Sequence, residues 1–466
     1  MELFTTFLGA ANTFLYTKFL IVALIFTGLY FTIRTGFVQL RLLPEAFKVI
    51  TEKSETEGSL SSFQALMIAT ASRVGTGNIA GVTTAIVLGG PGAVVWMWLM
   101  ALVGAASAFI ESTLAQIYKK KDGSIFKGGP AYYIETALNA RWLGIIFAIL
   151  LILTFAFGFN GLQAYNIASS FEYYVPGFYD TKIPMIIGFV LAAISAFLFF
   201  GGAHRIGKVS SLLVPIMACL YIVMGLIIFF TNIAKVPGVF ALCFEAAFDF
   251  KAIMGGFAGS CVVMGIKRGL FSNEAGMGSA PNAAASADVS HPVKQGLVQV
   301  LSVFIDTIII CSTTAFIVLL SGKAVTGGEL TGIPLVQAAV SAQFGEVGIH
   351  LVTIAICLFA FTSVIGNYFY AEANIKFINE SPILMTVFRG LAVLMVFVGT
   401  QVSMTTAWDT ADVLMGCMAT VNILAILLLG NTALKALKDY EHQKRQGKNP
   451  VFKASDIGLN NTEVWK

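Results

Sequence analysis

Long apolar runs without charged residues recur along almost the whole chain, and they limit what it can fold into. Each run has about 20 residues, the length that an α-helix needs to cross a bilayer core of roughly 30 Å. Charged residues lie between the runs and make up 12% of the 466 residues, whereas soluble domains contain roughly 25%. The pattern therefore predicts an all-α integral membrane protein.

The apolar runs predict about eleven membrane-spanning helices. No connecting segment is long and polar enough to form a soluble domain, so we expect residues 1–466 to make one transmembrane domain. Residues 432–466 are predicted to be a cytoplasmic tail. The expected helices cover residues 13–33, 63–88, 92–118, 142–171, 183–201, 207–232, 251–288, 293–321, 346–377, 383–400 and 408–431.

Lysine and arginine are concentrated in alternate loops, which predicts the orientation of the chain. One set of loops holds clusters such as 119–121, whereas the other set has isolated residues such as Lys182 and Lys235. Because cytoplasmic loops are enriched in lysine and arginine, we expect the N-terminus outside the cell membrane and the C-terminus in the cytoplasm. The net charge of +4 is small and gives no reason to expect nucleic acid as a partner.

Two of the expected helices contain glycines and ionisable residues near their middle. Helix 63–88 contains Arg73 and the run Gly75–Asn78, and helix 251–288 contains the run 265–279 with Lys267 and Arg268. Backbone that leaves the helix inside a bilayer exposes N–H and C=O groups, which only protein or a polar cavity can satisfy. For one such segment alone, close packing of glycine against a neighbouring helix is an equally good explanation.

The two interrupted helices occupy corresponding positions, since each is the first of five. This arrangement is typical of transporters built from inverted repeats, with a binding site near the middle of the membrane. Residues 63–232 and 251–431 would form the two repeats, and 13–33 would be an extra N-terminal helix.

A broken helix offers both of its ends to a ligand. The N–H groups of Gly75–Asn78 suit a carboxylate, and the carbonyl groups before the break suit a hard cation such as Na⁺. A zwitterionic amino acid beside Na⁺ would use both ends, whereas a sugar or nucleoside would use only part of them. Gln163, in the middle of helix 142–171, either reaches the same cavity or ties two helices together.

Several motifs resemble those of the alanine or glycine:cation symporter family. They are ASRVGTGNIAGVTTAI (71–86), GGPGAVVWMW (89–98), RGLFSNEAGMGSAPNAAA (268–285) and TSVIGNYFYAE (362–372), and they occur in the family's order along nearly the whole chain. The resemblance implies a LeuT-like fold of five plus five inverted helices. It also implies sodium-coupled symport of small neutral amino acids, alanine or glycine, by alternating access, with sodium as the co-transported ion.

The resemblance also implies sodium ligands. Symporters of this fold hold one Na⁺ between the first broken helix and the eighth core helix, which is helix 346–377 here. The matching positions are the carbonyl groups of Ala71, Val74 and Phe359 and the hydroxyl groups of Thr362 and Ser363. These hydroxyls have an alternative, because in membrane helices such groups often bond to the preceding turn.

The substrate is expected to lie beside this ion. Its carboxylate would meet the N–H groups of the first break, and its amino group would meet acceptors near the second, where Phe271 would form a wall of the pocket. The expected substrate contacts are Gly75, Thr76, Gly77, Asn78, Gln163, Phe271, Ser272 and Asn273.

Ionisable residues inside the membrane are costly and are usually functional or paired. Arg73, Glu111, Glu274 and Asp306 are expected to form ion pairs or an inner gate, and Glu274 and Asp306 are candidate partners of Arg73. Helix 346–377 has no lysine before Lys376 that could replace a sodium charge, which favours Na⁺ over a proton.

Other classes of protein fit the sequence less well. A proton-coupled or differently selective transporter of the same fold is the main alternative. A channel would show a filter motif or rings of like charge, which the sequence lacks. The four histidines are scattered and no HExxH or GxSxG motif marks a helix break, so we do not expect an enzyme. The oligomeric state is left open.

Overall fold

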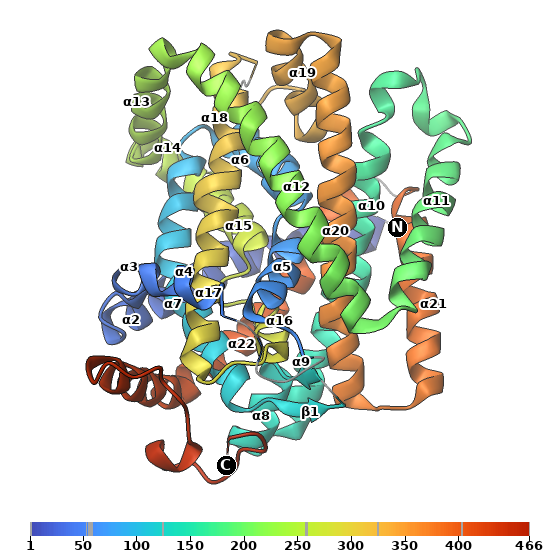
Figure 1. The fold of residues 1–466 in the computed structure, drawn as a ribbon. Coiled ribbons are helices and arrows are strands. Elements are labelled where there is room, and N and C mark those ends of the chain that lie inside the picture. Colours follow the sequence, from blue (N-terminus) through green and yellow to red (C-terminus); the bar gives the residue numbers. More distant parts are fainter. Residues whose placement is uncertain are drawn as a thin grey trace.

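The computed structural model describes residues 2–52, 54, 59–123, 125–256, 260–323, 326–401 and 404–465, with backbone alone for 2–7 and 404–407. The chain forms a bundle of helices with one short hairpin (Figure 1). Eight of the described helices are long and apolar enough to cross a membrane, and α11 (Ile183–Phe199) is a shorter apolar helix. The predicted all-α class is confirmed.

The predicted helix 63–88 is broken. It consists of α5 (Ser62–Arg73), the short η2 (Thr76–Asn78) and α6 (Ala80–Gly89). The rest of the first half contains α7 (Ala93–Ile117), β1 (Lys120–Asp122), β2 (Ile125–Lys127), α8 (Pro130–Leu138), α9 (Arg141–Ile152), η3 (Leu153–Phe159), α10 (Asn160–Ser169), η4 (Glu172–Tyr174), η5 (Phe178–Asp180), α11 and α12 (Gly202–Thr231).

The predicted helix 251–288 is also broken, but later than the sequence suggested. Its main part is α15 (Cys261–Asn273), which runs unbroken through Gly265 and Gly269, and the backbone leaves the helix only from Glu274. The remaining elements of the second half are η6 (Ile233–Lys235), α13 (Val236–Ala247), α14 (Phe250–Gly255), α16 (Pro281–Ser286), α17 (Pro292–Val303), η8 (Phe304–Cys311), α18 (Ser312–Leu320), α19 (Gly332–Phe344), α20 (Glu346–Ile378) and α21 (Pro382–Gly399).

The two ends of the chain differ from expectation. The N-terminal span is longer than 13–33, because α1 (Glu2–Phe14), η1 (Leu15–Phe19) and α2 (Leu20–Arg34) form one apolar stretch, which α3 (Val38–Arg41) and α4 (Leu43–Val49) follow. The expected tail from residue 432 is partly helical, since α22 (Met404–Arg445) continues the last span, and η9 (Ala454–Ile457) lies beyond it.

The start of each half follows from local chemistry. Ser61 Oγ accepts a hydrogen bond from Gln64 N at 3.2 Å, and Gln64 Oε1 accepts one from Ser61 N at 3.0 Å, which makes a capping box at the start of α5. Ser260 caps the start of α15 through a single bond, which its Oγ accepts from Val263 N at 3.5 Å. Both broken spans therefore begin at a serine that satisfies the first free N–H groups.

The bundle has two distinguishable ends (Figure 1). The hairpin β1–β2, α8 and the C-terminus lie at one end, which we call the C-terminal face, whereas α13 and α19 lie at the other, which we call the opposite face. The helix α5 runs from the C-terminal face to the first break. The Leu60 carbonyl, just before α5, accepts a hydrogen bond from Asp288 N at 2.9 Å. The carbonyl of Ala287, the residue before Asp288, accepts one from Lys119 Nζ, and Lys119 directly precedes the hairpin at that face.

Candidate functional site

The first break lies between Arg73 and Ala80 and is completely buried. Val74 leaves the helical conformation with ψ 80°, and Gly75 is extended with φ −128° and ψ −153°. Asn78 closes the turn, because its Oδ1 accepts a hydrogen bond from Gly75 N at 2.9 Å. The sequence run GTGN therefore makes a compact turn between two half-helices, as the sequence predicted.

Several backbone groups of this turn have no partner within the described part of the chain. The carbonyl groups of Ala71 and Val74 accept no hydrogen bond there, and the N–H groups of Gly77 and Gly81 donate none. All four residues are buried. Because unpaired buried backbone groups are rare and costly, these atoms are available for a ligand.

The helix α20 packs directly against this turn. A side chain at Gly75 would overlap the Ser363 hydroxyl, and one at Gly366 would overlap the backbone of Ser72. Thr362 Oγ1 and Ser363 Oγ each donate to the Phe359 carbonyl at 3.0 Å. The five expected sodium ligands thus lie on two packed elements, the end of α5 with its turn and the helix α20. The two hydroxyl groups bond to the carbonyls of α20 itself.

Gln163, in α10, also contacts the turn. Its Oε1 accepts hydrogen bonds from Thr76 N at 3.1 Å and from Thr76 Oγ1 at 2.9 Å. Asn166, one turn later in α10, donates to Thr76 Oγ1 at 3.0 Å. Gln163 therefore connects α10 to the break, and its contact with a substrate stays a prediction; Asn166 was missed, although its amide inside a predicted span was a visible signal.

Asn78 connects the first break to the second through Asp306. Its Nδ2 donates to Ser272 Oγ at 2.9 Å and to Asp306 Oδ1 at 2.6 Å, and Ser272 Oγ donates to Asp306 Oδ2 at 2.7 Å. Thr307 Oγ1 also donates to this carboxylate, at 2.8 Å. Asp306 belongs to the π-helical η8, a kind of turn that is frequent at functional sites.

Three aromatic rings enclose the same region. Phe271 lies against Gly77, where it would meet any added side chain, and its ring centroid is 4.7 Å from that of Phe159 and 5.1 Å from that of Trp408. The guanidinium carbon of Arg268 lies 4.2 Å from the centre of the Trp408 ring. Phe271 therefore forms a wall of the site, together with two rings that the sequence analysis missed.

Of two expectations about this region, the substrate contact of Asn273 stays a prediction and the ion pair of Arg73 is wrong. Asn273 makes no described contact with the first break; its Oδ1 accepts a hydrogen bond from Ala275 N at 3.0 Å, so it caps the end of its own helix. Arg73 forms no ion pair with Glu274 or Asp306 in the described structure, and its Nη1 donates instead to Gln299 Oε1 at 3.0 Å. Sequence spacing places these charges near the breaks, but it does not determine their partners.

Another group of charges lies one turn before Phe271. The Asp412 carboxylate forms ion pairs with Lys267 Nζ at 2.7 Å and with Arg268 Nη2 at 2.8 Å. Lys267 Nζ also donates to Asn12 Oδ1 at 3.0 Å. The ion pairs connect α15 to α22, and the hydrogen bond to Asn12 connects α15 to α1, so that both cations of the second broken span share one carboxylate.

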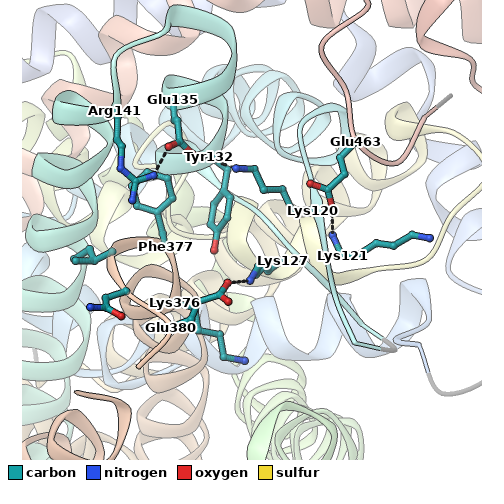
Figure 2. Close-up of a pocket in the computed structure, with 12 residues that line it drawn as sticks. Lys120, Lys121, Lys127, Tyr132, Glu135, Arg141, Lys376, Phe377, Glu380 and Glu463 are labelled. Atoms are coloured by element: carbon teal, nitrogen blue, oxygen red, sulfur yellow. Dashed lines mark hydrogen bonds and ion pairs between the residues drawn. The ribbon is translucent and has the colours of Figure 1, made fainter. Parts of the chain in front are cut away.

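A separate cavity of about 400 Å³ opens at the C-terminal face (Figure 2). Its charges are mostly paired with one another: Lys127 binds Glu380, Arg141 binds Glu135, and Lys120 binds Glu135 at 3.2 Å. The backbone N–H of Lys121 donates to Glu463 Oε1 at 2.9 Å. Because these side chains already satisfy one another, the unpartnered groups at the first break are the better candidate for a binding site.

Comparisons with known proteins are consistent with this geometry. The model of the family described as "Sodium:alanine symporter family" matches residues 1–454. The chain is 48% identical to the amino-acid carrier protein AlsT of Bacillus subtilis, over 99% of this chain and 98% of that protein. It is 46% identical to the probable sodium/glutamine symporter GlnT of the same organism, over 98% of this chain and 95% of that protein.

The fold is similar to that of a solved structure, MhsT in complex with L-phenylalanine. The TM-score is 0.53 at 16% sequence identity, and the likeness covers 89% of this chain and 95% of that one. At this level of identity the likeness concerns the fold alone. It supports the LeuT-like fold that the family resemblance implied.

Proposed function

This chain belongs to the sodium:alanine symporter family and is therefore a multi-pass membrane transporter rather than an enzyme, and we propose that it binds Na⁺ and a small neutral amino acid together at the first break. Sodium-coupled symport of amino acids is the function of the family. The residues that perform it here, the division into repeats at 63–232 and 251–431 and the orientation of the chain belong to the proposal.

One observation carries the sodium site. The buried carbonyl groups of Ala71 and Val74 have no hydrogen-bond donor among the described residues and lie on the segment that packs against Ser363. Na⁺ is a hard cation that prefers oxygen ligands, and inverted-repeat transporters coordinate it with carbonyls freed at a break. The proposed ligands are these two carbonyls, the Phe359 carbonyl and the hydroxyl groups of Thr362 and Ser363, which would rotate from their own helix toward the ion.

The amino acid would lie on the other side of the turn. The free N–H groups of Gly77 and Gly81, at the positive end of α6, suit its carboxylate. Its ammonium group would meet the Asp306 carboxylate, which Ser272 and Asn78 already orient. Gly75, Thr76 and Gln163 would hold the turn in shape between the two ligands.

The aromatic enclosure supports a small side chain. The ring of Phe271 lies against Gly77 and between Phe159 and Trp408, so little room remains beside the proposed carboxylate position. Alanine and glycine, which have the smallest side chains, are therefore the proposed substrates. A relative named as a sodium/glutamine symporter makes glutamine a second candidate substrate, which would require Phe271 or Trp408 to turn away.

Transport would follow from alternating access. Na⁺ would organise the turn at Gly75 in a state open to the outside, and substrate binding would then permit closure and opening to the inside. We propose that the C-terminal face is cytoplasmic, since it carries Lys120, Lys121, Lys127 and Arg141, as expected from the distribution of basic residues.

Uptake by purified protein in proteoliposomes tests the proposal. We expect labelled alanine to accumulate when an inward Na⁺ gradient is imposed, and unlabelled alanine and glycine to compete with it. Competition by glutamine at similar concentrations would favour the second candidate substrate. Accumulation driven by a pH gradient without sodium would contradict sodium coupling.

A further inference from the structure

One arginine and one glutamate are buried near the first break without forming an ion pair. Arg73 is the last residue of α5, and Glu274 is the first residue after α15; they are 2% and 1% exposed. Glu274 contacts Ser72, the neighbour of Arg73 in α5, at 2.9 Å, yet no ion pair of 4.0 Å or less joins Arg73 and Glu274 in the described residues.

Each group is held in place by neutral neighbours. Glu274 Oε1 accepts a hydrogen bond from Ser72 Oγ at 2.9 Å, and Glu274 Oε2 accepts one from Ser279 Oγ at 2.6 Å. Arg73 Nη1 donates to Gln299, but its Nε and Nη2 have no partner among the described atoms. Glu274 also has the left-handed backbone conformation, φ 55°, which is unfavourable for a residue other than glycine.

A third unpartnered group lies close to both charges. The Tyr370 hydroxyl, on α20, is completely buried and has no hydrogen-bond partner in the described structure. It lies one helical turn after Gly366 and Asn367, which pack against Ser72, the residue beside Arg73. Three elements, α5, the segment after α15, and α20, thus bring one anion, one cation and one hydroxyl to the same buried region.

This arrangement is costly unless something else binds there. A buried arginine with free N–H groups and a buried glutamate without a cation are each unfavourable, and direct pairing would relieve both. The structure instead keeps opposite charges apart, with hydrogen-bonding atoms left free. An α-amino acid zwitterion carries both complementary charges, and a guanidinium group matches the geometry of its carboxylate.

We propose that Arg73, Glu274 and Tyr370 form a second binding site for the amino-acid zwitterion, between the central site and the C-terminal face. Its carboxylate binds Arg73, its ammonium group binds Glu274, and Tyr370 contacts the carboxylate. The site holds the substrate after it leaves the first break, because α5 leads from that break toward the C-terminal face. The inference rests on the proposed amino-acid transport.

Charge-removing variants test this site with labelled alanine. In Arg73→Gln and Glu274→Gln we expect sodium-dependent alanine binding by the purified protein to stay within about threefold of wild type. Net uptake into proteoliposomes should fall at least about tenfold, because release is slowed. Arg73→Lys and Glu274→Asp keep the charges and should recover part of the uptake.

Two results would overturn the proposal. Unchanged uptake by both charge-removing variants would show that the charges do not contact the substrate on its path. A tenfold or larger increase in the sodium concentration for half-maximal uptake in Glu274→Gln, with normal release, would identify the site as a cation site. Both comparisons presuppose an active wild type; if wild-type protein itself shows no sodium-driven alanine uptake, the proposed function fails instead.

A milder variant distinguishes a loss of transport from a loss of folding. Tyr370→Phe removes only the unpartnered hydroxyl, and we expect uptake to slow about threefold with an unchanged melting temperature. Tyr368→Phe, on the same helix, is the matched control, since the Tyr368 hydroxyl has its own partner in Arg389 Nε at 3.0 Å. Equal uptake by Tyr370→Phe and wild type would contradict the role of Tyr370.

Discussion

The two breaks differ in how their backbone groups are satisfied. At the first break, between Arg73 and Ala80, the carbonyl groups of Ala71 and Val74 and the N–H group of Gly77 have no partner in the described structure. At the second break, the buried Glu111 accepts hydrogen bonds from Gly276 N at 3.2 Å and Gly278 N at 3.1 Å.

Further side chains bind the backbone of the second break. Asn422 Nδ2 donates to the Gly276 carbonyl at 2.8 Å and to Glu111 at 2.7 Å, and the Tyr133 hydroxyl donates to Asn422. Asn282 Nδ2 donates to the Ser279 carbonyl at 2.7 Å. The two breaks therefore differ in their side-chain support: at the second break side chains from α7, α16 and α22 bind the peptide groups of Gly276, Gly278 and Ser279, whereas the proposed ligand groups of the first break have no such partner in the described structure.

The largest expected effect concerns the second break. Glu111→Ala removes the acceptor of two backbone N–H groups and of Asn422, so we expect the free energy of unfolding to fall by about 3 kcal/mol or more. Thermal melting in detergent measures this loss. Glu111→Gln keeps one acceptor oxygen and should lose less, while Glu245→Ala, at an exposed position of α13, is the control. A Glu111→Ala variant that melts like wild type would remove the distinction between the breaks.

The next effect concerns the first break. In the double variant Thr362→Ala with Ser363→Ala, we expect the sodium concentration for half-maximal alanine uptake to rise at least about tenfold, a difference of about 1.4 kcal/mol. Melting should change little, because these hydroxyls bond only to their own helix and to Met217 Sδ. Wild-type sodium dependence in this variant would mean that the ion binds elsewhere.

A pair of glycine substitutions compares the breaks directly. Gly278 has φ 88° and lies against Asn422, Phe147 and Pro130, so Gly278→Ala should lower the free energy of unfolding by about 1–3 kcal/mol. Gly75 has φ −128°, which alanine adopts easily, but the new methyl group would meet Ser363. We therefore expect Gly75→Ala to weaken sodium affinity more than stability. A greater loss of stability in Gly75→Ala than in Gly278→Ala would reverse the comparison.

The smallest expected effect concerns Gln163. Gln163→Ala removes the acceptor of Thr76 N and Oγ1, and Asn166 remains to contact Thr76. We expect the KM for alanine to rise about three- to tenfold with little change in kcat, because the turn is held less firmly in the binding conformation. Uptake kinetics at saturating sodium measure both constants. A fall in kcat at constant KM would instead place Gln163 in the transport step.

Much of this architecture follows from local sequence. Uncharged runs of membrane length predict the spanning helices, and the run GTGN predicts the first break to within a few residues. These features are local, since helix propensity and the cost of unpaired backbone in lipid depend on neighbouring residues. The adjacent hydroxyls of Thr362 and Ser363 were likewise visible, because the family motif contains them.

The partners of the buried polar groups were decided only by the tertiary structure. Asp306 binds Asn78 and Ser272 rather than Arg73, Asn273 caps its own helix, and Glu111 satisfies a break more than 160 residues away, as the separations of 165 and 167 residues show. A buried charged side chain needs neighbours that can hydrogen-bond to it, and several polar residues along the chain could be those neighbours. Which of them it meets depends on how the helices pack, and that information is not local.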